Sequence, residues 1–148
     1  MATFSRHDGI LHCEDVSLEA IAATYGTPTY LYSRSAIETA FLDYQSALSD
    51  IPHLICYAVK ANSNLAILNV LAQLGAGFDV VSLGELARVV AAGGDPSKAV
   101  FSGVGKTTTE MQRALDLKLR CCSIESEAEL VSLAELADGA GRLADNST

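Results

Sequence analysis

Residues 56–74 have the sequence CYAVKANSNLAILNVLAQL, in which a short apolar run and a polar turn precede an amphipathic stretch. Similar apolar runs begin at Phe78, Val100 and Cys122, so the four starts are 22 residues apart. Helical patterns follow the four runs, at 65–74, 86–92, 111–117 and 130–137. A strand followed by a helix, repeated in this way, is typical of parallel strands that are buried on both faces.

Three of the predicted helices begin with the same signature, a serine or threonine followed three residues later by glutamate. The pairs are Ser82–Glu85, Thr107–Glu110 and Ser126–Glu129. In such a capping box the hydroxyl and the carboxylate each accept a hydrogen bond from an otherwise unpaired backbone amide. The boxes therefore predict helix starts directly after the predicted strands.

A repeat of this size suits either a (β/α)₈ barrel or a doubly wound sheet. A complete barrel needs about 250 residues, whereas the chain has 148. We predict an α/β fold of about four βα units; if it is a barrel, the chain stops halfway round. The last strand would leave an apolar edge near Cys122, and such edges pair with other chains. We therefore expect association or aggregation.

The N-terminal region has its own pattern. Ser17 is a plausible N-cap for a helix that Gly26 ends, and residues 29–32 are rich in strand-forming side chains. A second helix should follow, with Ser35 and Glu38 as its capping box. We expect this first stretch to form a short module of its own.

Composition excludes several classes of protein. Hydrophobic residues make up 49% of the chain and the formal charge is −8, so we expect a globular protein without a nucleic-acid or anionic-membrane partner. No apolar run reaches the roughly 18 residues of a membrane span, and the N-terminus lacks the apolar core of a signal peptide. We expect a cytoplasmic protein.

The cysteines and histidines do not have the spacing of metal ligands. Cys121 and Cys122 are adjacent, the other two cysteines are isolated, and the three histidines are scattered. We predict no metal site and four reduced cysteines.

Lys60 directly follows the first predicted strand, at the end where ligands and catalytic groups gather in parallel α/β folds. A lysine that leaves an apolar strand is partly desolvated, which favours the neutral amine. Such an amine can attack an aldehyde and form a Schiff base. The alternative is a lysine whose ammonium group is simply solvated.

Two acidic residues belong to the next predicted unit. Asp79 lies inside an apolar strand, where a carboxylate needs a partner, and Lys60 is the expected one. Glu85 is explained by the Ser82 capping box alone, so its carboxylate needs no catalytic role.

The segment Gly103–Thr107 ends like a phosphate-binding P-loop. That motif also requires a glycine at position 100, which is valine here. A small α/β nucleotide-binding module therefore remains an alternative, beside a glycine-bearing turn that Thr107 caps.

Four segments taken in order resemble one enzyme family. They are Tyr-Gly-Thr-Pro-Thr-Tyr-Leu-Tyr-Ser (25–33), Tyr-Ala-Val-Lys-Ala-Asn-Ser-Asn (57–64), Gly-Ala-Gly-Phe-Asp-Val-Val-Ser-Leu-Gly-Glu-Leu (75–86) and Val-Phe-Ser-Gly-Val-Gly-Lys-Thr (100–107). Together they look like the diaminopimelate decarboxylases, pyridoxal-phosphate enzymes whose barrel is shared with alanine racemase. The resemblance covers about residues 10–137.

The resemblance implies a function and a site. Lys60 matches the lysine that binds pyridoxal 5'-phosphate as a Schiff base, and Asp79 and Glu85 match acidic positions of the cofactor site. The reaction would be decarboxylation of meso-2,6-diaminopimelate to L-lysine, in a family whose members form homodimers. The resemblance also implies a fold. Residues 32–148 would form the N-terminal half of a (β/α)₈ TIM barrel, with about four βα units, and residues 1–31 would form a separate segment that joins a β-domain.

The same resemblance predicts an incomplete site. Histidines occur only at positions 7, 12 and 53, and no glycine-triplet loop for the cofactor phosphate is present. We therefore expect a truncated form that lacks most of the active site, with a non-catalytic remnant as a further alternative.

Overall fold

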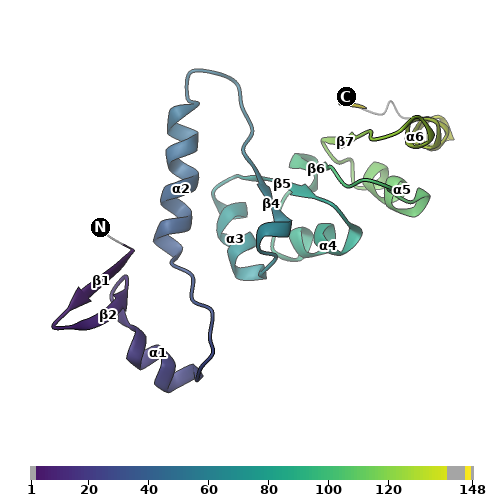
Figure 1. Ribbon diagram of the computed structural model, residues 1–148. Coiled ribbons are helices and arrows are strands. Elements are labelled where there is room, and N and C mark those ends of the chain that lie inside the picture. Colours follow the sequence, from purple (N-terminus) through teal and green to yellow (C-terminus); the bar gives the residue numbers. More distant parts are fainter. Residues whose placement is uncertain (1–2, 140–145, 148) are drawn as a thin grey trace. The chain divides into compact units, whose positions relative to one another are not determined.

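The computed structural model describes residues 3–139 and 146–147. The chain divides into two compact units, residues 1–46 and residues 47–148. Figure 1 shows their elements in chain order. The predicted division into 1–31 and 32–148 stays a prediction.

The first unit contains a small antiparallel sheet and two helices. Its elements are β1 (Phe4–His7), β2 (Ile10–Cys13), β3 (Val16–Ser17), α1 (Leu18–Tyr25) and α2 (Arg34–Ala47). The strands pair in the order β1-β2-β3. Asp8 and Gly9, with φ of 52° and 83°, form the two-residue turn between β1 and β2. Asp-Gly favours this turn because both positions need a positive φ.

The structure of this unit tests three predictions, two about helix starts and one about a strand. The Ser17 side chain accepts a hydrogen bond from the Ala20 amide at 3.0 Å, so the predicted start of α1 is confirmed. The predicted strand at residues 29–32 is wrong, because no strand pairs with this segment. The predicted cap Ser35 is also wrong, since Ser33 accepts from the Ala36 amide at 3.0 Å and the helix begins at Arg34.

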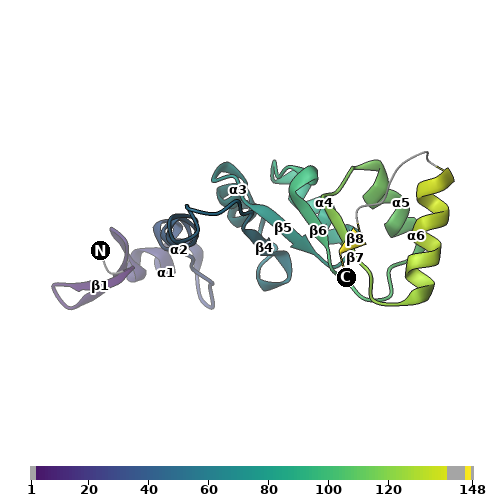
Figure 2. The same ribbon diagram turned by 90° about the horizontal axis from the view of Figure 1, so that it is seen from above.

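The second unit is a parallel sheet with a helix after each of its first four strands. Its elements are β4 (Cys56–Ala58), the 3₁₀ turn η1 (Val59–Ala61), α3 (Leu65–Gln73), β5 (Gly77–Val80), α4 (Leu83–Ala91), η2 (Pro96–Lys98), β6 (Ala99–Phe101), α5 (Thr108–Asp116), β7 (Cys121–Ser123), α6 (Glu127–Gly139) and β8 (Asn146–Ser147). The strand order is β4-β5-β6-β7-β8, with every neighbouring pair parallel (Figure 2). The four predicted βα units are confirmed.

The predicted capping boxes form to different degrees. At α5, Thr107 and Glu110 make the complete reciprocal box. The hydroxyls of Ser82 and Ser126 accept the expected amides of Glu85 and Glu129, each at 3.2 Å. The carboxylates of those two glutamates accept hydrogen bonds from other groups.

The two faces of the parallel sheet differ in burial. Phe78, Val80 and Phe101 are fully buried on the face that packs against the helices. The opposite face carries residues that are only half-buried; because side chains alternate along a strand, this open face comprises Cys56, Ala58, Asp79, Val100 and Cys121. The prediction that the strands are buried on both faces is therefore wrong for this chain.

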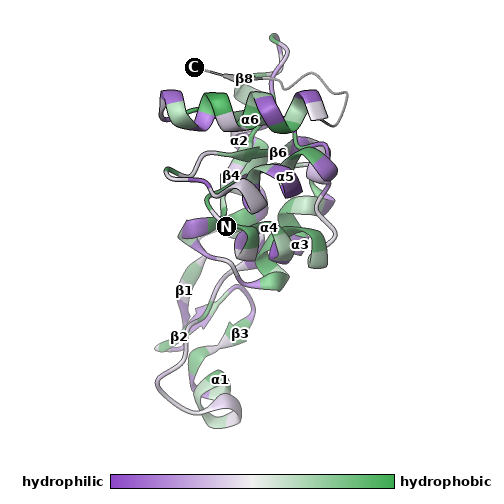
Figure 3. Ribbon diagram, turned by 90° about the vertical axis from the view of Figure 1, so that its right-hand side faces the viewer, coloured by the Kyte–Doolittle hydropathy of each residue, from purple (hydrophilic) through white to green (hydrophobic). Residues whose placement is uncertain are grey.

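The sheet edge beyond β7 is occupied. Cys122 pairs with Asn146 in β8, so the predicted unpaired edge near Cys122 is wrong. The helix α6 carries both hydrophilic and hydrophobic residues along its length, as its mixed colours show (Figure 3). Across the residues that the structure describes, no helix combines the length and the apolar character of a membrane span.

Candidate functional site

Lys60 lies at the carboxyl end of β4, as its position in the sequence predicts. It belongs to the η1 turn, two residues beyond Ala58, which is the register partner of Asp79. Its side chain is exposed, so the predicted partial desolvation is wrong. Within residues 3–139 and 146–147, neither of the two ion pairs involves Lys60. The site therefore presents a primary amine to solvent.

Asp79 lies on the open face and is paired, but with a different residue from the one predicted. The Ser102 hydroxyl donates a short hydrogen bond to Asp79 Oδ1. Ser102 directly follows β6, and its amide donates to the Val80 carbonyl at 3.0 Å, which holds the hydroxyl beside the carboxylate. The expected Lys60–Asp79 ion pair is absent from the described part of the chain.

Ser102 is the residue of this site that the sequence reasoning missed. Its place depends on the register between β5 and β6, in which Asp79 pairs with Val100, two residues before Ser102. An offset of two residues from the register partner places Ser102 diagonally beside Asp79, on the same face, and the 22-residue spacing of the apolar runs does not reveal this register.

Glu85 occupies a helix start. Its amide donates to Ser82 Oγ at 3.2 Å, and its Oε2 accepts from the Val81 amide at 2.9 Å. These are the hydrogen bonds of a helix cap, which is the alternative interpretation of this glutamate. A role for Glu85 at a cofactor stays a prediction.

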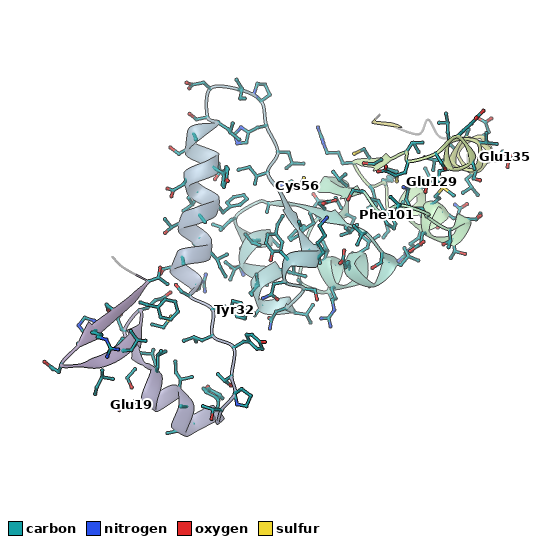
Figure 4. The ribbon with its side chains drawn as sticks, in the orientation of Figure 1. Glu19, Tyr32, Cys56, Phe101, Glu129 and Glu135 are labelled. Carbon is teal, nitrogen blue, oxygen red and sulfur yellow. The ribbon has the colours of Figure 1, made fainter. Side chains whose placement is uncertain are left out.

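Cys56 is a further neighbour on the open face (Figure 4). Burial, followed by the negative charge of Asp79, raises the pKa of the Cys56 thiol above its ordinary value. None of the four cysteines, all of which lie within the described residues, forms a disulfide. The thiol is therefore neutral at physiological pH, and the Asp79 carboxylate provides the negative charge on this face.

The P-loop-like segment has a structural role. Lys106 is 6% exposed, and its ammonium donates to the Gly103 carbonyl at 2.6 Å and to Glu129 Oε2 at 2.9 Å. A P-loop lysine has to reach the phosphates of a nucleotide. The buried contacts of Lys106 rule out that function, so the geometry does not support the nucleotide-binding alternative.

Comparison with known proteins identifies the family. A family model described as pyridoxal-dependent decarboxylase, pyridoxal binding domain, matches residues 34–144. The chain belongs to this family of decarboxylases. Membership confirms the resemblance drawn from the sequence and implies pyridoxal phosphate as the cofactor.

Individual relatives agree with the assignment. A diaminopimelate decarboxylase of Pseudomonas aeruginosa is 58% identical over 93% of this chain and 33% of its own length. Two crystal structures are of diaminopimelate decarboxylases complexed with L-lysine. The Helicobacter pylori enzyme has a TM-score of 0.83 and 44% identity, over 86% of this chain and 32% of its own. The M. jannaschii enzyme has a TM-score of 0.94 and 32% identity, over 99% and 35%.

The chain spans about a third of the length of these relatives. Their similarity confirms the predicted α/β barrel class, of which this sheet is a part. The activity and the substrate named for these relatives refer to their whole chains, and for this chain they are proposals.

The residues present fit one part of pyridoxal phosphate. The exposed Lys60 amine matches the aldehyde of the cofactor, with which a primary amine condenses. The open face beside it carries the Asp79 carboxylate, which Ser102 orients. The described part of the site can therefore supply the covalent anchor and one oriented acidic group.

Proposed function

We propose that the chain supplies the lysine-bearing part of a pyridoxal-phosphate-dependent carboxy-lyase that converts meso-2,6-diaminopimelate to L-lysine. The position of Lys60 at the carboxyl end of β4, in a chain 58% identical to a diaminopimelate decarboxylase, carries the proposal. The L-lysine in two of the solved relatives is the product of the proposed reaction.

The chemistry divides between cofactor and protein. When bound, pyridoxal phosphate supplies an electron sink for the carbon–carbon bond that breaks as carbon dioxide leaves. Lys60 would hold the cofactor through its side-chain nitrogen. Asp79, held by the Ser102 hydroxyl, fixes a negative charge at the same edge of the sheet. Glu85 is proposed as a further acidic group of the site.

We propose that the rest of the site comes from polypeptide that corresponds to the remaining two-thirds of the relatives. Phosphate sites in such barrels come from loops after strands seven and eight. The 148-residue chain should therefore bind pyridoxal phosphate weakly, without a stable visible absorption band.

Reductive trapping tests the anchor. Incubation with pyridoxal phosphate and borohydride converts even a transient lysine adduct into a stable amine, which peptide mass spectrometry locates. We expect the adduct on Lys60 in several-fold excess over the exposed Lys118. The variant Lys60→Ala should lose it, and Lys118→Ala should keep it. Equal yields at the two lysines would contradict the proposal.

We also propose that the chain is cytoplasmic.

We further propose that the chain associates in solution, as the homodimer of the family or as larger assemblies. The half-exposed open face and the edge strand β4 support association. Light scattering at rising concentration should give a mass above 15.5 kDa. A monodisperse monomer over the whole range would exclude it.

A further inference from the structure

Lys106 and Glu129 form a buried ion pair that the proposed reaction does not use. Lys106 Nζ lies 2.9 Å from Glu129 Oε2, and the two side chains are 1% and 8% exposed. Burying two charges requires their removal from water, so such a pair contributes little net stability compared with apolar residues of similar volume. Its presence therefore calls for an explanation other than stability alone.

The Glu129 carboxylate joins two successive loops. Its Oε1 accepts from the Lys106 amide at 3.0 Å, in the loop between β6 and α5. Its Oε2 accepts from the Glu125 amide at 3.1 Å, in the loop between β7 and α6. Burial raises the pKa of Glu129, but its hydrogen bonds with Lys106 and Glu125 outweigh burial and leave that pKa below the ordinary value. The carboxylate is therefore charged at neutral pH.

The Lys106 ammonium extends the connection toward the third loop. It donates to the Gly103 carbonyl at 2.6 Å. Gly103 in turn packs directly on the turn after β5, because a Cβ at this position would lie 2.7 Å from the Val81 carbonyl oxygen. The segment after β6 is thus held between Val81 on one side and the Lys106–Glu129 pair on the other.

Ser102, whose hydroxyl orients Asp79, immediately precedes Gly103. We propose that Lys106 and Glu129 are positioning residues, whose buried pair fixes the loop after β6 so that Ser102 keeps its hydrogen bond to Asp79. The meaning of this device for catalysis rests on the proposed function, in which Asp79 lies at the cofactor. The device itself is a property of the chain without cofactor.

Two NMR signals of the cofactor-free chain test the proposal. One is the ¹³C shift of the Asp79 carboxyl carbon, which reports the hydrogen bond from Ser102. The other is the exchange rate of the Ser102 amide, which donates its hydrogen bond to the Val80 carbonyl and not to a member of the pair. The variant Ser102→Ala provides a reference, namely the ¹³C shift of the Asp79 carboxyl carbon when the Ser102 hydroxyl is absent. Glu135→Gln, an exposed position on the same helix, is the matched control (Figure 4).

We expect Glu129→Gln to move the Asp79 carbon toward its position in Ser102→Ala and to accelerate Ser102 amide exchange about tenfold. Amides within β5 and β6 should keep their exchange rates, because a local release of the loop leaves the sheet intact. Glu135→Gln should change neither signal. General destabilisation would instead accelerate exchange throughout the sheet and leave the Asp79 carbon in place.

A second variant is needed because Glu129→Gln leaves the buried Lys106 charge unpaired and could prevent folding. Lys106→Met combined with Glu129→Met removes both charges at similar volume, a replacement that proteins often tolerate. It should give the same Asp79 shift and the same faster exchange. The proposal is overturned if the Asp79 carbon stays in place in the folded double variant or in Ser102→Ala. It is also overturned if both pair variants fail to fold. Because no cofactor is present, these outcomes are independent of the trapping experiment.

Discussion

Lys60 and Lys106 show how environment separates two side chains of identical chemistry. Lys106 is buried, and its ammonium is held by Glu129 and the Gly103 carbonyl. Lys60 leaves the sheet on a short 3₁₀ turn and is exposed. Of the two amines, only that of Lys60 is accessible to an aldehyde, because the Lys106 amine is enclosed by its buried partners.

Burial also separates the adjacent thiols Cys121 and Cys122. Burial is the largest of the effects that raise the pKa of Cys122, which lies on the covered face at 6% exposure, whereas Cys121 is half-buried on the open face. We expect iodoacetamide to modify Cys122 at least about tenfold more slowly than Cys121 in the native chain, since the thiolate is the reactive form. Tandem mass spectrometry distinguishes the two positions. In urea the rates should converge, and equal native rates would refute the assignment of faces.

The sequence was sufficient to predict the place of Lys60 but not the partner of Asp79. A lysine after an apolar strand is visible in the local pattern, whereas the hydrogen bond from Ser102 depends on the register between β5 and β6. The contacts of the Glu129 carboxylate could not be predicted from the sequence, for another reason. Its amide satisfies the Ser126 cap, so the spacing indicated a capping box while the carboxylate was bound elsewhere.

The start of α2 depends on a residue that is distant in sequence. Glu14 Oε1 accepts from the Ser33 hydroxyl at 2.6 Å and from the Ser35 amide at 2.9 Å. The Ser33 hydroxyl in particular, with the Ser35 amide, lowers the pKa of the Glu14 carboxyl. A negative charge at a helix start is also favoured by the helix dipole. The turn after β2 therefore fixes the beginning of α2.

This contact should make the first unit sensitive to acid. Because the folded-state pKa of Glu14 is lowered, its contribution is fully present above the unfolded value of about 4.3 and is lost as the pH falls through the folded value. Glu14→Gln should lower the urea midpoint at pH 7, and the difference from the parent chain should shrink toward pH 3. Asp43→Asn, an exposed control in the middle of α2, should behave as the parent.

Tyrosine fluorescence can follow that transition, because four of the five tyrosines lie within residues 1–46. A difference between Glu14→Gln and the parent that is independent of pH would contradict the assigned contact.

Periodic apolar patterns predicted the helices of both units, although burial differs between the units. The helices α3, α4 and α5 each bury two or three apolar side chains, whereas α1 buries none. The errors concern segments that are too short to show a period. The β1–β2 hairpin was not predicted, although Asp8-Gly9 is a strong turn signal between two short runs. Residues 29–32 have strand-forming side chains, but a strand also needs a partner, and none pairs with them.

The second unit is a parallel sheet covered by helices on one face. The repeat of apolar runs predicted its four βα units because each strand must bury side chains against the following helix. The repeat could not predict the open face, since alternating half-buried residues such as Ala58 and Val100 have apolar side chains too. That face carries Asp79 beside the end of β4, where we propose that Lys60 anchors the cofactor.

Decarboxylation by a reassembled enzyme tests this claim most directly. The chain would be mixed with the part of the Pseudomonas aeruginosa relative that it does not cover, together with pyridoxal phosphate and meso-2,6-diaminopimelate, and the release of carbon dioxide would be measured. We predict release at least about a hundredfold faster than with Lys60→Ala, with Lys118→Ala equal to the parent. Release that is unaffected by Lys60→Ala, or no release above that of either part alone, would contradict the account.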